Sequence, residues 1–353
     1  MKLHPNLSKR ELEHWLREDN SVQLDRLWHH ADETRKQYVG DEIYPRGLLE
    51  ISNYCVRHCT YCGINQDCLS VHRYRMSEQE IIEAATEAVR RGYGTVVIQA
   101  GEDYRLTRAL IARVVKTIKA ATGLVVALSL GERSLATLRE WKKHGADRYF
   151  LRFETSDPQL YDLIHPGRGN QPVGLSRRVD QLLVIRRLGY ELGSGVMIGI
   201  PGQSYSSLAE DILLFRELDL DMIGVGPYIA DPATVLGQGK IAIKSLGPDQ
   251  VPANGLMTYK TIALARTVCP GANITSTTAL ATVETEHGRE LGWQRGANIF
   301  MPNITPKFYR EQYTIYPGKR AEDDLTAIHN QIQRLGRKFG IGVGSSKKGF
   351  FNF

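Results

Sequence analysis

The chain has 353 residues, of which 42% are hydrophobic and 24% are charged, an ordinary composition for a globular protein with a core. No apolar run reaches the roughly 18 residues that a membrane-spanning helix needs, and the start, MKLHPNLSKRELEHW, lacks the apolar segment of a secretion signal. The net charge of +6 is scattered and no nucleic-acid-binding motif accompanies it, so we expect a cytoplasmic protein with no nucleic-acid and no membrane partner.

The chain opens on a polar segment, about residues 8–37, whose pattern is helical and begins with a capping box between Ser8 and Glu11. After residue 46, short apolar runs alternate with amphipathic segments. The apolar runs predict strands over 47–52, 95–101, 124–131, 147–154, 191–202, 221–228, 272–278 and 298–303. The segments between them predict helices over 77–92, 106–123, 133–146, 173–190, 207–220, 253–269 and 285–297. A last helix is expected over about 321–339.

Strict alternation of strands and helices predicts an α/β protein with parallel strands joined by helical crossovers. Eight such units favour a closed (β/α)8 TIM barrel. We therefore expect an N-terminal helical extension over 1–46, the barrel over 47–320, and a C-terminal helix with a basic tail over 321–353. A doubly wound open sheet is the alternative, but its GxGxxG dinucleotide fingerprint is missing.

Polar or otherwise unusual residues gather where the predicted strands end. Because active sites of such barrels lie at the carboxyl ends of the strands, this placement predicts an enzyme. The residues expected at this rim are Cys55, Gly101, Glu102, Ser129, Arg152, Glu154, Met197, Met222, Thr277, Thr278 and Asn303.

Four of the five cysteines lie in ISNYCVRHCTYCGINQDC, residues 51–68. Three of them, Cys55, Cys59 and Cys62, are separated by three and then two residues, directly after the first predicted strand. Clustered thiols in a chain without a disulfide framework predict metal ligands, and three ligands leave one coordination position open. A zinc site that uses Cys68 as a fourth ligand is the alternative.

The three-cysteine spacing after the first strand resembles the radical S-adenosylmethionine (SAM) superfamily, and Tyr61 stands where that family commonly has an aromatic residue. The resemblance implies a [4Fe–4S] cluster on three thiolates, with SAM chelating the fourth iron. QAGED, residues 99–103, stands where the family has a Gly-Gly-Glu element, and Ala100 occupies the position of the first glycine. The residues that the resemblance assigns to SAM are Tyr61, Gly101, Glu102, Ser129, Arg152, Glu154 and Arg178.

Structural roles remain open for three of these residues. The alternative for Arg152 and Glu154 is an ordinary ion pair at the barrel rim. The alternative for Arg178 is a solvated arginine on a helix. No side chain in the sequence stands out as a general acid or base.

A longer resemblance, over about residues 30–320, is to the HydE-type maturases of FeFe-hydrogenase, and less closely to methylornithine synthase and biotin synthase. It rests on co-linear segments such as GADRYFLRFETSDP, LGYELGSGVMIGIPGQS and GANIFMPNITPKFYREQYTIYPGK. It implies anaerobic radical chemistry on a small iron–carbonyl–cyanide complex that bears cysteine, an external electron donor, and the other hydrogenase maturases as partners. The residues it places around the substrate are Met197, Met222, Thr277, Thr278 and Tyr316.

Three departures from the family pattern bear on the substrate: Phe153 in place of a histidine, Ala127 in place of a threonine, and an altered loop over 229–235. Two rival functions therefore stay open at this point. One is a radical SAM reaction on an amino acid, in the manner of methylornithine synthase. The other is a non-catalytic carrier of an iron–sulfur cluster.

Overall fold

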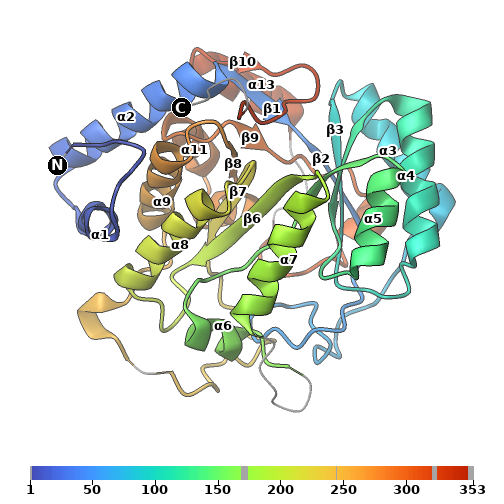
Figure 1. The fold of residues 1–353 in the computed structure, drawn as a ribbon, viewed down its shortest axis with the longest axis horizontal. Helices are drawn as coiled ribbons and strands as arrows, with labels where there is room; N and C mark the ends of the chain where they lie inside the picture. Colours follow the sequence, from blue (N-terminus) through green and yellow to red (C-terminus); the bar gives the residue numbers. More distant parts are fainter. Residues whose placement is uncertain (1, 168–173, 244, 320–323, 349–353) are drawn as a thin grey trace.

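The computed structural model describes residues 2–167, 174–243, 245–319 and 324–348. Within them a single parallel sheet runs in the order β10-β1-β9-β8-β7-β6-β5-β4-β3-β2 (Figure 1). The eight predicted strands are all found. They are β2 (Gly47–Ser52), β3 (Thr95–Ala100), β4 (Val125–Ser129), β5 (Ala146–Phe150), β6 (Glu191–Ile198), β7 (Met222–Pro227), β8 (Asn273–Ser276) and β9 (Ile299–Phe300). Two short strands were not predicted, β1 (Glu42–Pro45) and β10 (Lys338–Phe339).

The helices that connect the strands pack on the outer face of the curled sheet (Figure 1). The predicted ones are α3 (Glu78–Arg90), α4 (Arg108–Thr122), α5 (Leu135–Lys143), α7 (Leu175–Arg187), α8 (Tyr205–Glu217), α9 (Gly255–Val268) and α11 (Gly288–Gln294). The short helices α6 (Pro158–Ile164), α10 (Thr278–Val283) and α12 (Lys307–Arg310), and a 3-10 turn at Gly247–Asp249, were not predicted. Each is too short for a periodic pattern to stand out.

The helical pattern expected over about 8–37 is confirmed but divides into two helices, and the expected end of the last helix is wrong. The N-terminal segment forms two helices, α1 (Lys9–Arg17) and α2 (Ser21–Val39), because the Asn20 side chain accepts a hydrogen bond from the Gln23 N–H and starts a second helix. The last helix, α13, covers Leu325–Arg334 rather than reaching residue 339, because the backbone at 338–339 pairs with β1 as β10. Residues 321–323 of the expected helix lie outside the described residues.

The α/β class with a curled parallel sheet is confirmed, whereas closure into an eightfold barrel stays a prediction. Leu48 of β2, the strand at one end of the order, is bonded to the segment that follows β9, the third strand from the other end. Its N–H donates to the Pro302 carbonyl at 2.8 Å, and its carbonyl accepts from the Ile304 N–H at 2.9 Å. These bonds join β2 to the segment that follows β9.

The sheet carries a small apolar cluster on three neighbouring strands, β2, β3 and β4. Leu48, Val97 and Ala127 form this cluster together with Met301. On β6, Gly195 leaves space for a close approach to β7, since a Cβ on it would lie 1.9 Å from the Gly224 carbonyl oxygen.

The N-terminal helices α1 and α2 pack against α8 and α9. The buried ammonium group of Lys260 on α9 donates to the Leu16 carbonyl and to Asp19, both at 3.0 Å, which ties this extension to the sheet domain. The division at residues 46 and 320 stays a prediction. Among the helices that the structure describes, none is long and apolar enough to cross a membrane.

Candidate active site

The segment between β2 and α3 that carries the cysteines, residues 53–72, is called the cysteine loop. Arg73 stabilises the conformation of this loop, because its guanidinium donates hydrogen bonds to four backbone carbonyls of the loop. The distances are 2.6 Å to Asn53, 2.7 Å to Ile64, 2.6 Å to Asn65 and 3.0 Å to Cys68. A loop with little regular structure is thereby held in one shape. Sequence reasoning missed this role.

The three spaced cysteines lie close enough to influence one another. Burial, followed by the neighbouring Cys55, raises the pKa of Cys59 to about 12. Burial also raises the pKa of Cys62, as do Cys59 and Cys55. Thiols in such a place stay protonated on their own, and a metal that binds them must release the protons and supply positive charge.

The Cys68 side chain faces two backbone carbonyls. Its thiol donates to the carbonyls of Cys62, at 3.9 Å, and Ala233, at 3.7 Å. In the described ranges no group of three or more His, Cys, Asp or Glu side chains surrounds a single metal-ion position. A [4Fe–4S] cluster takes its thiolates on different irons, so three spaced thiols fit the cluster better than they fit zinc.

Gly101 explains why the loop after β3 carries a glycine. A Cβ at this position would lie 2.2 Å from the Tyr54 carbonyl oxygen and 2.9 Å from Cβ of Cys55. The next residue continues the contact, since the Val56 N–H donates to the Glu102 carbonyl at 3.0 Å. Only a residue without a side chain lets the β3 loop lie against the cysteine loop in this way.

A chain of charges runs from the cysteine loop to α7. The Arg57 guanidinium contacts Glu102 at 2.9 Å and Glu132 at 2.6 Å, and Glu132 in turn accepts from Arg178 Nε at 2.9 Å. Burial alone would raise the pKa of Glu132, but Arg178 and Arg57 hold that pKa below its ordinary value. Glu132 is therefore an anion that joins two arginines, and sequence reasoning missed it together with Arg57.

Arg152 and Glu154 follow β5 and point to the same side of the sheet. Arg152 Nε donates to Glu154 Oε1 at 2.6 Å, while its other nitrogens donate to the carbonyls of Gly224 and Val196. Glu154 has a left-handed backbone, with φ of +64°, a conformation that costs energy for a residue with a side chain. No described residue donates to its buried Oε2 atom, so this oxygen is available to a ligand.

Tyr61 reaches from the cysteine loop to the same carboxylate. Its hydroxyl lies 3.5 Å from Glu154 Oε1 and 3.2 Å from His165 Nε2. Burial lowers the pKa of His165 well below its ordinary value, so the ring is neutral. Because Nδ1 lies 3.1 Å from the Tyr161 carbonyl and must donate to it, Nε2 is the acceptor. Sequence reasoning missed His165, which ends a helix that was not predicted.

Four more of the predicted residues lie at the carboxyl rim. Ser129 is the last residue of β4 and is half-buried. Arg178, on α7, is nine-tenths buried and also donates to the Arg152 carbonyl at 2.5 Å, so it is not a solvated arginine. Thr277 caps α10 and donates to the Val225 carbonyl at 3.0 Å, and Thr278 is the first residue of that helix.

Two predicted substrate residues reach the site from different directions. Met197 is half-buried and packs in one apolar cluster with Tyr61. Tyr316 is half-buried in the segment after β9, and burial raises its pKa, with Glu50 adding to the rise. Met222 was expected at the rim, and this is wrong. It begins β7 and lies at the amino end of that strand, whose carboxyl end is Pro227.

The interior holds a buried ion pair that sequence reasoning missed. Glu50 of β2 is completely buried and contacts the ammonium group of Lys319, while Asn303 Nδ2 donates to its other oxygen at 3.0 Å. The Lys319 ammonium also lies 4.6 Å from the centre of the Tyr313 ring. A glutamate inside the apolar strand GLLEIS was the available signal, since a buried charge needs a partner.

The departures from the family pattern fall in different places. Phe153 is fully buried and packs on Phe215 of α8, with ring centres 5.8 Å apart, so it belongs to the outer core. Ala127 is the middle residue of β4 and belongs to the apolar cluster with Leu48 and Val97. The altered loop contacts the cysteine loop, because the Cys68 thiol donates to the Ala233 carbonyl at 3.7 Å.

Comparison with known proteins agrees with this geometry. Residues 49–215 match the radical SAM superfamily. The chain is 41% identical to the [FeFe] hydrogenase maturase subunit HydE of Thermotoga maritima, over 91% of this chain and 88% of that protein. It is 25% identical to the 3-methylornithine synthase of Methanosarcina acetivorans, over 93% and 88%.

Solved structures share the fold. The crystal structure of methylornithine synthase (PylB) aligns with a TM-score of 0.76 over 95% of this chain and 94% of that one, at 22% identity. The maturase HydG from Carboxydothermus hydrogenoformans aligns with a TM-score of 0.78 over 95% and 76%, at 18% identity. At these identities the structures are informative about the architecture alone.

Proposed function

This chain belongs to the radical SAM superfamily, and from that premise we propose that it is a HydE-type maturase in the assembly of the FeFe-hydrogenase active site. It is a radical SAM enzyme that uses a [4Fe–4S] cluster and S-adenosylmethionine. When both are bound, an electron from the cluster cleaves SAM and supplies a 5′-deoxyadenosyl radical. The observation that carries the maturase proposal is the 41% identity to a named maturase over 91% of this chain.

We assign the cluster to Cys55, Cys59 and Cys62, in the cysteine loop that Arg73 fastens. The donor set fits, since the three thiols are clustered and Cys68 is engaged elsewhere. The external electron donor that the reaction requires is part of the proposal.

We assign SAM to the charged groups beside the loop. The unpartnered Oε2 of Glu154 accepts from a ligand hydroxyl or ammonium group, and Arg178 offers a planar guanidinium to a carboxylate. The remaining assigned residues are Tyr61, Gly101, Glu102, Ser129 and Arg152. In the structure Glu102 and Arg178 are linked through Arg57 and Glu132, so these two side chains are already oriented before a ligand arrives.

The substrate proposal is a small iron–carbonyl–cyanide complex that bears cysteine, held in the barrel interior by Met197, Thr277, Thr278 and Tyr316. The charged pair of Glu50 and Lys319 lies in that interior and suits a polar, charged substrate rather than an apolar one. The walls exclude water from the radical chemistry, and no residue is assigned as a general acid or base.

The closed (β/α)8 barrel belongs to the same proposal. The two backbone bonds between Leu48 and the segment after β9 support it. Closure on that side separates the interior from solvent, so that substrate approaches from the rim.

The maturase proposal is tested in an anaerobic hydrogenase maturation mixture that contains the other maturases and lacks HydE. Added wild-type chain is expected to restore hydrogen evolution, and Cys59→Ala is expected to leave it at background. A chain that cleaves SAM but never restores hydrogenase, and that instead converts a lysine-like substrate, is an amino acid mutase of the methylornithine synthase kind.

A further inference from the structure

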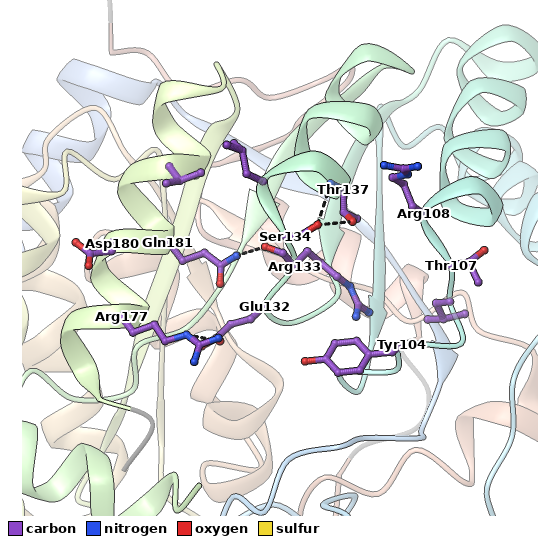
Figure 2. A pocket seen from close by; sticks show the side chains of 13 residues that line it. Tyr104, Thr107, Arg108, Glu132, Arg133, Ser134, Thr137, Arg177, Asp180 and Gln181 are labelled. Carbon is purple, nitrogen blue, oxygen red and sulfur yellow. Dashed lines mark hydrogen bonds and ion pairs between the residues drawn. The ribbon is translucent and has the colours of Figure 1, made fainter. Parts of the chain in front are cut away.

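A groove outside the barrel interior is lined by arginines from three elements (Figure 2). It lies between the starts of α4 and α5 and the side of α7, and has a volume of 590 Å³. This volume is typical of sites for small molecules, which occupy about 300–1,000 Å³. We call it the arginine groove, after Arg108, Arg133 and Arg177.

Arg133 is the arginine that the fold fixes most firmly. It is nine-tenths buried, and its Nη2 donates to the Asp103 carbonyl at 2.9 Å. No residue in the described part of the chain accepts from its Nε. The guanidinium carbon lies 5.2 Å from the centre of the Tyr104 ring, which forms one wall of the groove. A buried cation with unused donors is costly unless a ligand of opposite charge completes it.

Arg177 approaches from the opposite wall. Its side chain is 74% exposed and its Nε lies 4.0 Å from Glu132. Glu132 also pairs with Arg57 and Arg178, so this one carboxylate is shared among three arginines and does not balance the whole charge of the groove. Figure 2 shows the other acidic residue, Asp180, directed away from Tyr104 and Arg133. The groove is therefore positively charged where its walls converge.

Two helix starts add to this charge. Thr107 caps α4 by accepting from the Leu110 N–H, and Ser134 caps α5 by accepting from the Thr137 N–H. Each cap leaves the first N–H groups of its helix without an intrahelical partner. Helix starts of this kind favour anions, and phosphate in particular.

We propose that the arginine groove binds the phosphoryl group of a small molecule between Arg133, Arg177 and the start of α5. The aromatic wall formed by Tyr104 suits a planar group attached to the phosphate. The site is separate from the barrel interior, but it shares Glu132 with the chain of charges that reaches the cysteine loop. Phosphate binding in the groove is therefore expected to change the contact between Glu132 and Arg178.

The test is isothermal titration calorimetry of the anaerobic, cluster-loaded chain with inorganic phosphate, phenyl phosphate and acetate. Saturable binding of both phosphates, and not of acetate, is expected. Tighter binding of phenyl phosphate than of phosphate indicates an ester as the ligand, and equal binding indicates phosphate itself. Arg177→Gln is expected to weaken binding about tenfold or more, since one charge-assisted contact is removed.

Arg139→Gln is the matched control, because Arg139 is an exposed arginine on α5 that does not line the groove. It is expected to leave phosphate affinity unchanged. Arg133→Gln is expected to abolish binding, and if it fails to fold, Arg177→Gln still decides the question. Absence of saturable binding, or an equal loss in Arg139→Gln, overturns the proposal. Neither result depends on SAM cleavage, which is measured separately.

Discussion

Glu132→Gln is the change that most directly probes how the site is held together. The glutamate is the anion between Arg57 and Arg178, and its side chain is 6% exposed beside an Arg178 side chain that is 10% exposed. Glutamine keeps the volume and one acceptor but removes the charge, so two arginines lose their shared counter-ion.

The expected cost follows from that burial. Breaking a buried pair from one side costs about 3–5 kcal/mol, and the retained amide oxygen favours the lower end of this range. Arg178 also loses the contact that orients it, which is worth about 1.5–3 kcal/mol for a charge-assisted hydrogen bond. SAM affinity is therefore expected to fall roughly tenfold to a hundredfold.

Two assays separate the effects. Denaturant unfolding reports the free energy of unfolding, and titration of SAM into the reduced, cluster-loaded chain, followed by electron paramagnetic resonance, reports affinity. Glu140→Gln on α5 is the control, because the partly exposed Glu140 side chain pairs with His144 at 3.5 Å, and it is expected to change neither value. Unchanged stability and unchanged SAM affinity in Glu132→Gln refute the argument that this chain of charges holds the site.

Three further predictions test neighbouring parts of the structure. Gly101→Ala is expected to lower the cluster content per chain, measured by iron and sulfide analysis, because the new Cβ would lie 2.2 Å from the Tyr54 carbonyl oxygen. Gly271→Ala is the control, since a Cβ there has no neighbour closer than 3.5 Å, and its cluster content is expected to equal that of the wild type. Cys68→Ser is expected to keep full cluster content and SAM cleavage, and loss of the metal in this variant supports the zinc alternative instead. Burial raises the pKa of Asp211 to about 7. Its contribution to stability is therefore full below the unfolded pKa of about 3.9 and lost as pH rises through about 7. Unfolding measured from pH 4 to pH 8 is expected to show this decline in the wild type and a flatter profile in Asp211→Asn, and equal slopes contradict it.

The parts of the fold that could be predicted are those in which apolar runs and amphipathic segments alternate regularly along the sequence. All eight strands of the repeat were found, because buried parallel strands are continuous apolar runs bounded by turns. The elements that were missed are short or depend on partners far along the chain. β10, for example, exists only because residues 338–339 pair with β1.

The site was predictable where residues fall next to a motif or a strand end. The positions of the cysteines, Arg152 and Glu154 just beyond strand ends were predicted in this way, whereas their roles stay predictions. Arg73 and Glu132 were not, because their roles depend on which carbonyls or arginines the fold brings to them. Met222 was placed at the rim by mistake. It is the second residue of the strand predicted over 221–228, so it lies at the amino end of that strand, as the structure shows.

Cleavage of SAM by the reduced protein tests the central claim most directly. The chain is reconstituted anaerobically with iron and sulfide, reduced, and mixed with SAM, and 5′-deoxyadenosine is measured by chromatography. The account predicts the nucleoside from the wild type and none from Cys59→Ala. A wild-type chain with an intact cluster that releases no 5′-deoxyadenosine under several reductants contradicts the account and favours a non-catalytic cluster carrier.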